Sequence, residues 1–187
     1  MTVGLFAVDL LIKRWSFANV APRPVELRRG IDDHHAFWSQ YPHEAIDLVP
    51  WVLSLKLTTN TGAVFGLGKG SQPLFIIMSL VAVGVIGYFF YHGDRRAWPR
   101  HVGLALILGG ALGNLYDRVM FNAVRDMFWL LPGVKLPFGL RWPGGMDDAY
   151  PWLFNLADVA LLAGVGMMVV ILWFEDTRRQ AAGKAQG

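Results

Sequence analysis

The stretch WLFNLADVALLAGVGMMVVILWF at positions 152–174 contains one charged residue, Asp158. The tryptophans near its two ends are 21 positions apart, which corresponds to about 31 Å on an α-helix and matches the roughly 30 Å of bilayer hydrocarbon. Tryptophans at both ends suit the two membrane–water interfaces. The stretch therefore predicts a membrane-spanning helix, and it indicates that the chain folds in a bilayer.

Two earlier stretches have the same character. Residues 70–93 contain no Asp, Glu, Lys or Arg, and their apolar part at 73–91 would cover about 28 Å as a helix. Residues 101–116 are also free of Asp, Glu, Lys and Arg, and they end immediately before Asp117. A buried helix of a soluble protein would not explain three such stretches in a chain of 187 residues, so we expect most of the chain to lie in a membrane.

The beginning of the chain is less regular. Residues 1–12 are apolar except for Asp9, and Lys13 and Arg14 follow. This run reaches only about 18 Å as a helix, too short to span a bilayer. A signal peptide fits poorly, because no basic region precedes the apolar run and the aspartate interrupts it. Either a first helix continues past Lys13, or the chain begins partway into a spanning helix; we favour the second interpretation.

The composition agrees with this class. Hydrophobic residues make up 54% of the chain and charged residues only 17%, with a mean hydropathy of +0.38, whereas soluble domains carry about 25% charged residues. The absence of cysteine excludes a disulfide scaffold, a thiolate metal site and a cysteine nucleophile. The formal charge of +3 comes from scattered basic residues, so we expect no nucleic-acid partner.

Basic residues predict the orientation of the spans. The link HGDRRAWPRH at 92–101 is short and holds three arginines, and the tail after the last span holds Arg178, Arg179 and Lys184. Under the positive-inside rule both segments face the cytoplasm. An even number of spans then places both termini in the cytoplasm.

Two segments, roughly 14–70 and 119–151, then face outward. In the first, LVPWVLSLKLTTN at 48–60 has enough alternation and β-branching for one or two strands. In the second, LPGVKLPFGLRWPGG at 131–145 is punctuated by Pro and Gly, so we expect a loop that lies on the membrane surface.

Ionisable side chains within or beside a membrane span are costly, so each is a functional candidate. Asp158 lies six residues into the last predicted span, and Asp126 follows the span that precedes it. Taken alone, Asp158 could equally be a structural aspartate, and Asp126 a loop residue in water. Asp117 and Arg118 end the third helix, and an adjacent Asp-Arg at a helix end favours a structural ion pair.

Two asparagines support polar clusters over isolated charges. Asn114 and Asn155 each precede an aspartate by three positions, which predicts an amide and a carboxylate on one helix face. The glycines of GALGNL at 110–115 lie inside a span, so they indicate close helix packing and not a phosphate-binding loop.

The two candidate aspartates suggest a reaction. If Asp126 and Asp158 approach each other near the outer leaflet, repulsion and a dry setting would raise one pKa and leave a shared proton. One carboxylate can then take a proton from water while the other protonates or polarises a carbonyl, as in aspartic proteases. No Ser-His-Asp order or phosphate loop competes. His34 and His35 are adjacent and lack a metal-ligand spacing, so we expect no metal site.

Four blocks of the sequence resemble a known family. They are NTGAVFG (60–66), GGALGNLYDRV (109–119), VRDMF (124–128) and FNLADV (154–159), and they look like the signature blocks of lipoprotein signal peptidase (signal peptidase II). Asp9 and Lys13 match that family's D-x-x-x-K motif on the first helix. The blocks occur in family order, and the four-helix hydropathy covers almost the whole chain.

The resemblance implies a polytopic aspartyl endopeptidase of the bacterial inner membrane that cuts diacylglyceryl-modified prolipoproteins just before the lipidated cysteine. Asp126 and Asp158 would be the catalytic dyad. The supporting polar residues would be Asn60, Asn114, Asp117, Arg118 and Asn155, with Asp9 and Lys13 on the first helix. Water would be the nucleophile, so no metal or organic cofactor is expected. Membrane lipids would surround the enzyme, and the cyclic peptide globomycin would bind near the dyad as an inhibitor.

The implied fold is a single α-helical membrane domain over 1–187, with four transmembrane helices, a small periplasmic β-cradle and a periplasmic lid helix or loop after Asp126. Helix one is expected at about 1–20, where the given sequence could start partway into the helix. The other expected segments are an outward β-rich segment at about 14–70, helix two at about 72–92, helix three at about 101–120, an outward loop at about 121–151, helix four at about 152–174 and a cytoplasmic tail at 175–187.

The chain departs from the family pattern at three places. Members usually have an apolar residue before the first catalytic aspartate and Phe after it, whereas Arg125 and Met127 flank Asp126 here. Arg125 could lower the pKa of that aspartate or point outward to lipid headgroups. The outward segments are also enlarged, at 22–44 and 136–151, in parts that would face the substrate.

Two other functions remain open at this point. A catalytically inactive relative could act as a membrane binding scaffold, although the retained aspartates and asparagines argue against it. A small transporter or proton channel could use intramembrane acids as a relay, but transporters usually show pseudo-repeats, and we see none. Loss of peptide cleavage after changing either aspartate would separate the enzyme from both.

Overall fold

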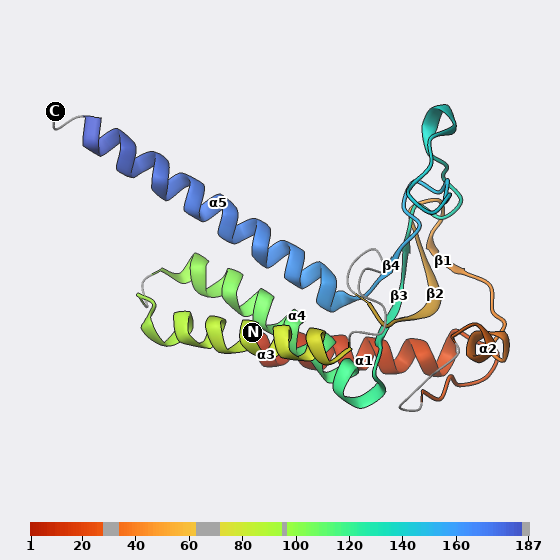
Figure 1. Ribbon diagram of the computed structural model, residues 1–187. Coiled ribbons are helices and arrows are strands. Elements are labelled where there is room, and N and C mark those ends of the chain that lie inside the picture. The colour runs from red at the N-terminus through yellow and green to blue at the C-terminus, as the bar shows by residue number, and fades with distance from the viewer. Residues whose placement is uncertain (28–33, 63–71, 95–96, 185–187) are drawn as a thin grey trace.

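In the computed structural model, which describes residues 1–27, 34–62, 72–94 and 97–184, the long helices of residues 72–92, 98–121 and 156–184 extend to one side of a small sheet, and the first helix reaches from them to the sheet (Figure 1). Residues 63–66 of the NTGAVFG block, 28–33 of the first enlarged segment and two arginines of the basic link lie outside the described residues. The elements are α1 (Thr2–Asn19), α2 (His34–Ser39), β1 (Ile46–Val49), β2 (Leu53–Asn60), α3 (Gln72–His92), α4 (Trp98–Phe121), β3 (Val124–Leu130), a 3-10 turn (Pro137–Gly139), β4 (Leu153–Phe154) and α5 (Leu156–Lys184).

Three of the described helices are long and apolar enough to cross a membrane, at Pro73–His92, Trp98–Phe121 and Leu156–Ala181. Apolar side chains such as Val81, Leu162 and Val169 project from them unburied, as expected for surfaces that contact lipid. The chain is therefore a helical membrane protein with a small antiparallel sheet.

Helix α1 is not among these three, yet it is continuous. It runs through Asn19, past Lys13, so the described helix does not stop at the basic pair that ends the apolar run. Its buried polar residues Asp9, Lys13 and Ser16 lie three or four positions apart. Because that spacing keeps side chains on one face of a helix, α1 presents a polar stripe to the rest of the molecule.

Helices α4 and α5 pack backbone to backbone through glycine. A Cβ atom at Gly110 of α4 would collide with the carbonyl oxygen of Ala157 on α5, and one at Gly164 would lie 2.7 Å from the carbonyl oxygen of Gly103. No larger residue fits these contacts without moving a helix. The expectation that the glycines of the GALGNL block permit close helix packing is confirmed.

The sheet has the order β1-β2-β3-β4, with every neighbouring pair antiparallel. The expected strands in segment 48–60 are confirmed as the end of β1 and all of β2, joined at Trp51, whose φ is 66°. A register shift between Leu55 and Thr58 places Thr58 opposite Asp126. The sheet thus carries one candidate aspartate on its third strand.

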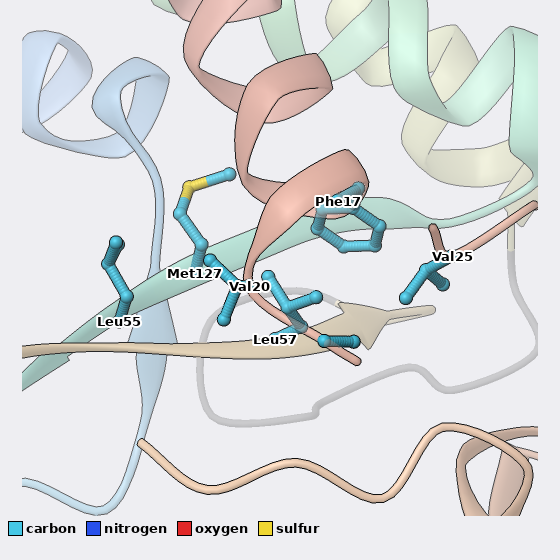
Figure 2. Packing of buried hydrophobic residues seen from close by; sticks show 7 residues of the cluster. Phe17, Val20, Val25, Leu55, Leu57 and Met127 are labelled. Atoms are coloured by element: carbon cyan, nitrogen blue, oxygen red, sulfur yellow. The ribbon is translucent and has the colours of Figure 1, made fainter. Parts of the chain in front are cut away.

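A compact apolar cluster attaches the sheet to α1 (Figure 2). Phe17, at the end of α1, and Val20, just after it, pack with Leu57 of β2 and Met127 of β3. All four are buried. Because Met127 and Asp126 are adjacent on a strand, their side chains point to opposite faces, so this cluster fixes the side of the sheet away from the aspartate.

The segment after β3 is a long hairpin (residues 131–152), with a single 3-10 turn at Pro137–Gly139. Backbone bonds from Leu136 to Asp147 and from Ala149 to Val134 close it. The helical form of the expected lid is therefore wrong for these residues, and the loop form holds. The reason is local: prolines recur along the segment, and four glycines adopt positive φ (Gly133, Gly139, Gly144 and Gly145), which interrupts any helix.

Candidate active site

Asp126 reaches the interior because α4 ends in a sharp turn. Asn122 caps the helix in the left-handed conformation, with φ 58°, and its N–H donates to the carbonyl of Arg118. This kind of cap redirects the chain within one residue, so β3 starts at Val124 and its third residue is Asp126. The carboxylate is buried.

Asp158 lies in the first turn of α5, and not six residues into it. Leu153 and Phe154 pair with β3 as β4, so the helix begins only at Leu156. Asn155 caps it: the Asn155 N–H donates to Asp158 Oδ2 at 3.1 Å, and the Asp158 N–H donates to Asn155 Oδ1 at 3.1 Å. This reciprocal pair is a capping box. The expectation of a shared helix face for these two residues is therefore wrong, because Asn155 precedes the helix.

Asn155 also joins the two candidate aspartates. Its Nδ2 donates to Asp126 Oδ1 at 2.6 Å and to Asn114 Oδ1 at 3.2 Å. The Asn114 Nδ2 in turn donates to Asp158 Oδ1 at 2.8 Å. The structure thus brings Asp126 and Asp158, which are separated by an entire hairpin in sequence, onto one pair of asparagines.

The environment of Asp126 favours its neutral form. Burial raises the pKa of this carboxyl well above its ordinary value, and the nearby charge of Asp158 raises it further, while the hydrogen bond from Asn155 opposes the shift. A buried carboxyl beside a second carboxylate retains its proton at a pH where an exposed aspartate has lost it. The pair can therefore hold one proton between them.

A buried cluster of four charges, here called the charge quartet (Asp9, Lys13, Asp117 and Arg125), supports this site. Lys13 Nζ lies 2.8 Å from Asp9 Oδ2 and 3.3 Å from Asp117 Oδ2. Arg125 donates to Asp117 Oδ1 from Nε at 3.1 Å and from its terminal nitrogen at 2.7 Å. Two positive and two negative charges cancel, so the cluster can be buried without a net charge.

The quartet touches both halves of the candidate site. Lys13 Nζ donates to Asn114 Oδ1 at 3.1 Å, which orients that amide so that its Nδ2 faces Asp158. Asp9 Oδ1 accepts the N–H of Ala157 at 3.0 Å, the residue before Asp158. Gly113 makes room for this contact, because a Cβ there would collide with the Asp9 carboxylate.

Two expectations about arginines are wrong. Asp117 does not pair with its neighbour Arg118 but with Arg125 and Lys13. Arg125 therefore neither points to lipid headgroups nor acts as the partner of Asp126. The reason is the alternation of side chains along β3, which directs Arg125 and Asp126 to opposite faces of the sheet. Arg125 lies on the face that covers the end of α4, where it contacts Asp117.

Arg118 and Asn60 occupy the margin of the site. Arg118 lies over the ring of Phe75 at 5.4 Å, and its buried Nε has no hydrogen-bond partner among the described residues. Asn60 ends β2 opposite Val124, and its Oδ1 accepts the N–H of Gly62 at 2.9 Å. Among the described contacts, neither side chain bonds directly to Asp126 or Asp158.

An aromatic run beside Asp126 was missed in the sequence. Phe128 stands two residues after Asp126, on the same face of β3, and its ring lies 5.7 Å from that of Phe154. Phe154 contacts Tyr150 at 6.1 Å, and burial together with the charges of both aspartates raises the pKa of Tyr150. Only the pairing of β3 with β4 brings these rings together, and β4 has too few residues to leave a sequence signal.

Chemically, the site offers two aspartate side chains held by one pair of asparagines at the junction between helices and sheet. Such a pair can accept a proton from water and give one to a carbonyl oxygen. Among the residues that the structure describes, no three His, Asp or Glu side chains are arranged to hold a metal ion.

Comparison with known proteins gives a consistent result. A family model described as "Signal peptidase (SPase) II" matches residues 1–174. The lipoprotein signal peptidase of Latilactobacillus sakei subsp. sakei (strain 23K) is 39% identical over 129 residues, covering 69% of this chain and 75% of that protein. The lipoprotein signal peptidase of Syntrophotalea carbinolica is 35% identical, with coverage of 74% and 80%.

Two solved structures share the fold. Both are described as bacterial membrane enzymes determined by the in meso method, at 2.3 and 1.9 Å resolution. The first superposes with a TM-score of 0.68 over 95% of this chain and 87% of the other at 22% identity. The second gives a TM-score of 0.62 over 91% and 88% at 23% identity.

Proposed function

The chain belongs to the signal peptidase II family, and we propose that Asp126 and Asp158 are the carboxylates with which this membrane aspartyl endopeptidase activates water. Its substrates are lipoprotein precursors, from which it removes the signal peptide. We infer that the precursor carries a diacylglyceryl group and is cut just before the lipidated cysteine. The observation that carries the proposal is Asn155, which bonds to both carboxylates at once.

The two aspartates have different roles. Asp126 starts protonated, because burial and the neighbouring carboxylate raise its pKa. Asp158 takes the other role: its oxygens accept hydrogen bonds from Asn114 and from the backbone of Asn155, and the partial positive charge at the start of α5 stabilises negative charge there. Asp158 is thus the base, and Asp126 is the acid.

The reaction follows with protons in balance. Asp158 takes a proton from water as the water oxygen attacks the scissile carbonyl carbon, and Asp126 gives its proton to the carbonyl oxygen. The tetrahedral intermediate collapses when Asp158 passes its proton to the leaving nitrogen of the cysteine and Asp126 recovers one from the hydroxyl. The carbon–nitrogen bond breaks, and both aspartates return to their starting states.

The remaining polar residues position this pair or meet the substrate. Asn114 and Asn155 hold the two carboxylates, and the quartet of Asp9, Lys13, Asp117 and Arg125 holds Asn114 and the start of α5. We assign substrate contact to the two marginal residues, Arg118 and Asn60. The buried Nε of Arg118 has no bond within the described residues, so it can donate to a peptide carbonyl.

We further infer that α1 is a fourth span. Its 18 residues correspond to about 27 Å. The charges of Asp9 and Lys13 are buried against α4 and α5, while apolar side chains such as Val3 and Leu11 are exposed. With four spans, the basic link at 92–101 and the basic tail place both termini in the cytoplasm. The sheet then lies at the outer face of the bacterial inner membrane, where it forms the β-cradle.

The test is a gel-shift assay with purified protein in detergent or liposomes, a diacylglyceryl prolipoprotein and its unlipidated precursor. Wild type should shorten only the lipidated precursor, and globomycin should block it. Asp126→Asn and Asp158→Asn should each abolish cleavage while remaining folded. Asp176→Asn is the matched control, because that aspartate lies on α5 but is exposed.

Cleavage by either dyad variant at the wild-type rate would refute the assignment of that residue. A well-folded wild type without activity on the lipidated precursor would instead favour an inactive membrane scaffold.

A further inference from the structure

Three apolar residues adopt an unfavourable backbone conformation at one end of the sheet. Trp51, Leu131 and Phe138 have φ values of 66°, 51° and 59°, in the left-handed region that bulky residues rarely adopt. Among the described residues, the only other side-chain-bearing residue with positive φ is the helix cap Asn122. Such outliers persist when something repays their cost.

Contacts inside the protein do not repay the cost for two of the three. Phe138 is 98% exposed and Trp51 is 75% exposed, and Leu140, two residues after Phe138, is 58% exposed. A large apolar side chain gains free energy only when it leaves water. We therefore infer that the stabilisation that compensates for the strained backbone at Trp51 and Phe138 comes from contact with a surface outside the chain.

The place of the long hairpin points to the bilayer as that surface. The base of the sheet joins the spans directly, since β3 begins three residues after α4 ends and α5 begins two residues after β4 ends. In Figure 1 the hairpin rises steeply from the region where α4 ends and α5 begins, and it does not continue the direction of either helix. A hairpin with this direction lies along a membrane that α4 and α5 cross.

The charges of the hairpin also suit a lipid surface. Its two carboxylates, Asp147 and Asp148, are both bonded to Lys135, at 2.8 and 2.9 Å. No aspartate or glutamate lies between Lys135 and Asp147, and the exposed Arg141 follows Leu140. The tip thus combines apolar side chains with a positive charge, the combination that binds the headgroup region of membranes containing anionic lipids.

We propose that the tip of the long hairpin is a membrane anchor that inserts Phe138 and Leu140 into the outer lipid interface and holds the sheet, with Asp126 on it, against the bilayer. Trp51, at the neighbouring turn, lies at the same end: the Leu131 N–H donates to the carbonyl of Val52 at 2.9 Å. The inference rests on the membrane orientation given above, but not on the catalytic roles of the aspartates.

The test uses the absence of cysteine from the chain. Phe138→Cys and Leu140→Cys are each labelled with a nitroxide and reconstituted in liposomes of phosphatidylethanolamine and phosphatidylglycerol that contain no other protein. The accessibility of the label to oxygen and to a water-soluble nickel chelate is then measured. Val169→Cys, on the exposed face of a span, is the lipid reference, and Glu44→Cys, on an exposed loop, is the water reference.

We expect both hairpin labels to favour oxygen over nickel, as the Val169 label does, and the preference to weaken when the anionic lipid is omitted. Labels that are as accessible to nickel as the Glu44 reference would overturn the proposal. That result is also expected if the tip is a docking site for another protein, because the liposomes contain no other protein. The readout needs no cleavage, so it stays informative if the dyad assignment fails.

Discussion

Replacing Arg125 with methionine tests whether the charge quartet is structural. In the folded protein the guanidinium donates twice to Asp117 Oδ1 and lies 4.8 Å from the ring of Phe121. Methionine has a similar length and keeps the backbone N–H that bonds to Asp117 Oδ2 at 3.0 Å. Arg125→Met therefore removes the positive charge and its two hydrogen bonds while largely preserving volume.

The expected loss of stability follows from burial. Removing one partner of a buried ion pair costs about 3–5 kcal/mol, because the other charge is left uncompensated. Lys13 still lies 3.3 Å from Asp117, which puts the loss near the lower limit, about 3 kcal/mol. Arg125→Lys should lose less, since it keeps the charge but not the two-pronged geometry.

The assay is denaturant unfolding of the detergent-solubilised protein, combined with the pH profile of cleavage. The double variant Arg125→Met/Asp117→Asn restores neutrality, so its loss should be smaller than the sum of the two single losses. Full stability of Arg125→Met together with a shifted pH profile would refute the reasoning, because it would mean that the arginine acts on Asp126.

Two further predictions concern the dyad and the helix crossing. Burial and the charge of Asp158 raise the pKa of Asp126 above its value in the unfolded chain. The folded protein therefore keeps a proton that the unfolded chain releases, so the stability of wild type should fall as pH rises above about 4. Asp126→Asn should lack this fall, and parallel pH–stability curves for the two proteins would contradict the prediction. Gly110→Ala should destabilise the protein by about 1–3 kcal/mol in the same unfolding assay, because its Cβ meets the carbonyl of Ala157, whereas Gly87→Ala, with open space around it, should not; equal effects would show that the crossing is not tight.

Hydropathy was sufficient to locate helices α3 and α4, because the bilayer imposes its length directly on the sequence. The stretches at 73–91 and 101–116 lie within helices α3 and α4. The same measure failed at the start of α5, since Trp152, Leu153 and Phe154 are as apolar as the helix that follows. The pairing of Phe128 with Phe154 and the cap at Asn155 delay the start of α5 to Leu156, and strand pairing is not encoded in local hydropathy.

The partners of buried charges were equally beyond the sequence. Adjacency made Arg118 the obvious partner of Asp117, but neighbouring residues on a helix point about 100° apart. The cap at Asn122 returns the chain so that Arg125 meets Asp117 in its place. By contrast, the pairing of Asp126 with Asp158 was predicted by the resemblance of the VRDMF and FNLADV blocks to signature blocks of the family, whereas charge and hydropathy alone left their approach as a condition.

The first helix explains why so many charges are buried around Asp126 and Asp158. Asp9 accepts the N–H of Ala157, the residue before Asp158, and Lys13, one turn away, donates to Asn114, which donates to Asp158. A neutral amide in either place would satisfy the same hydrogen bonds, but it would not attract the opposite charges that lock the pair. Because Lys13 and Arg125 share Asp117, this aspartate links α1 to β3, and the relative position of Asp126 and Asp158 depends on both elements. The four buried charges compensate one another through their ion pairs, and through those pairs they hold the elements that carry Asp126 and Asp158.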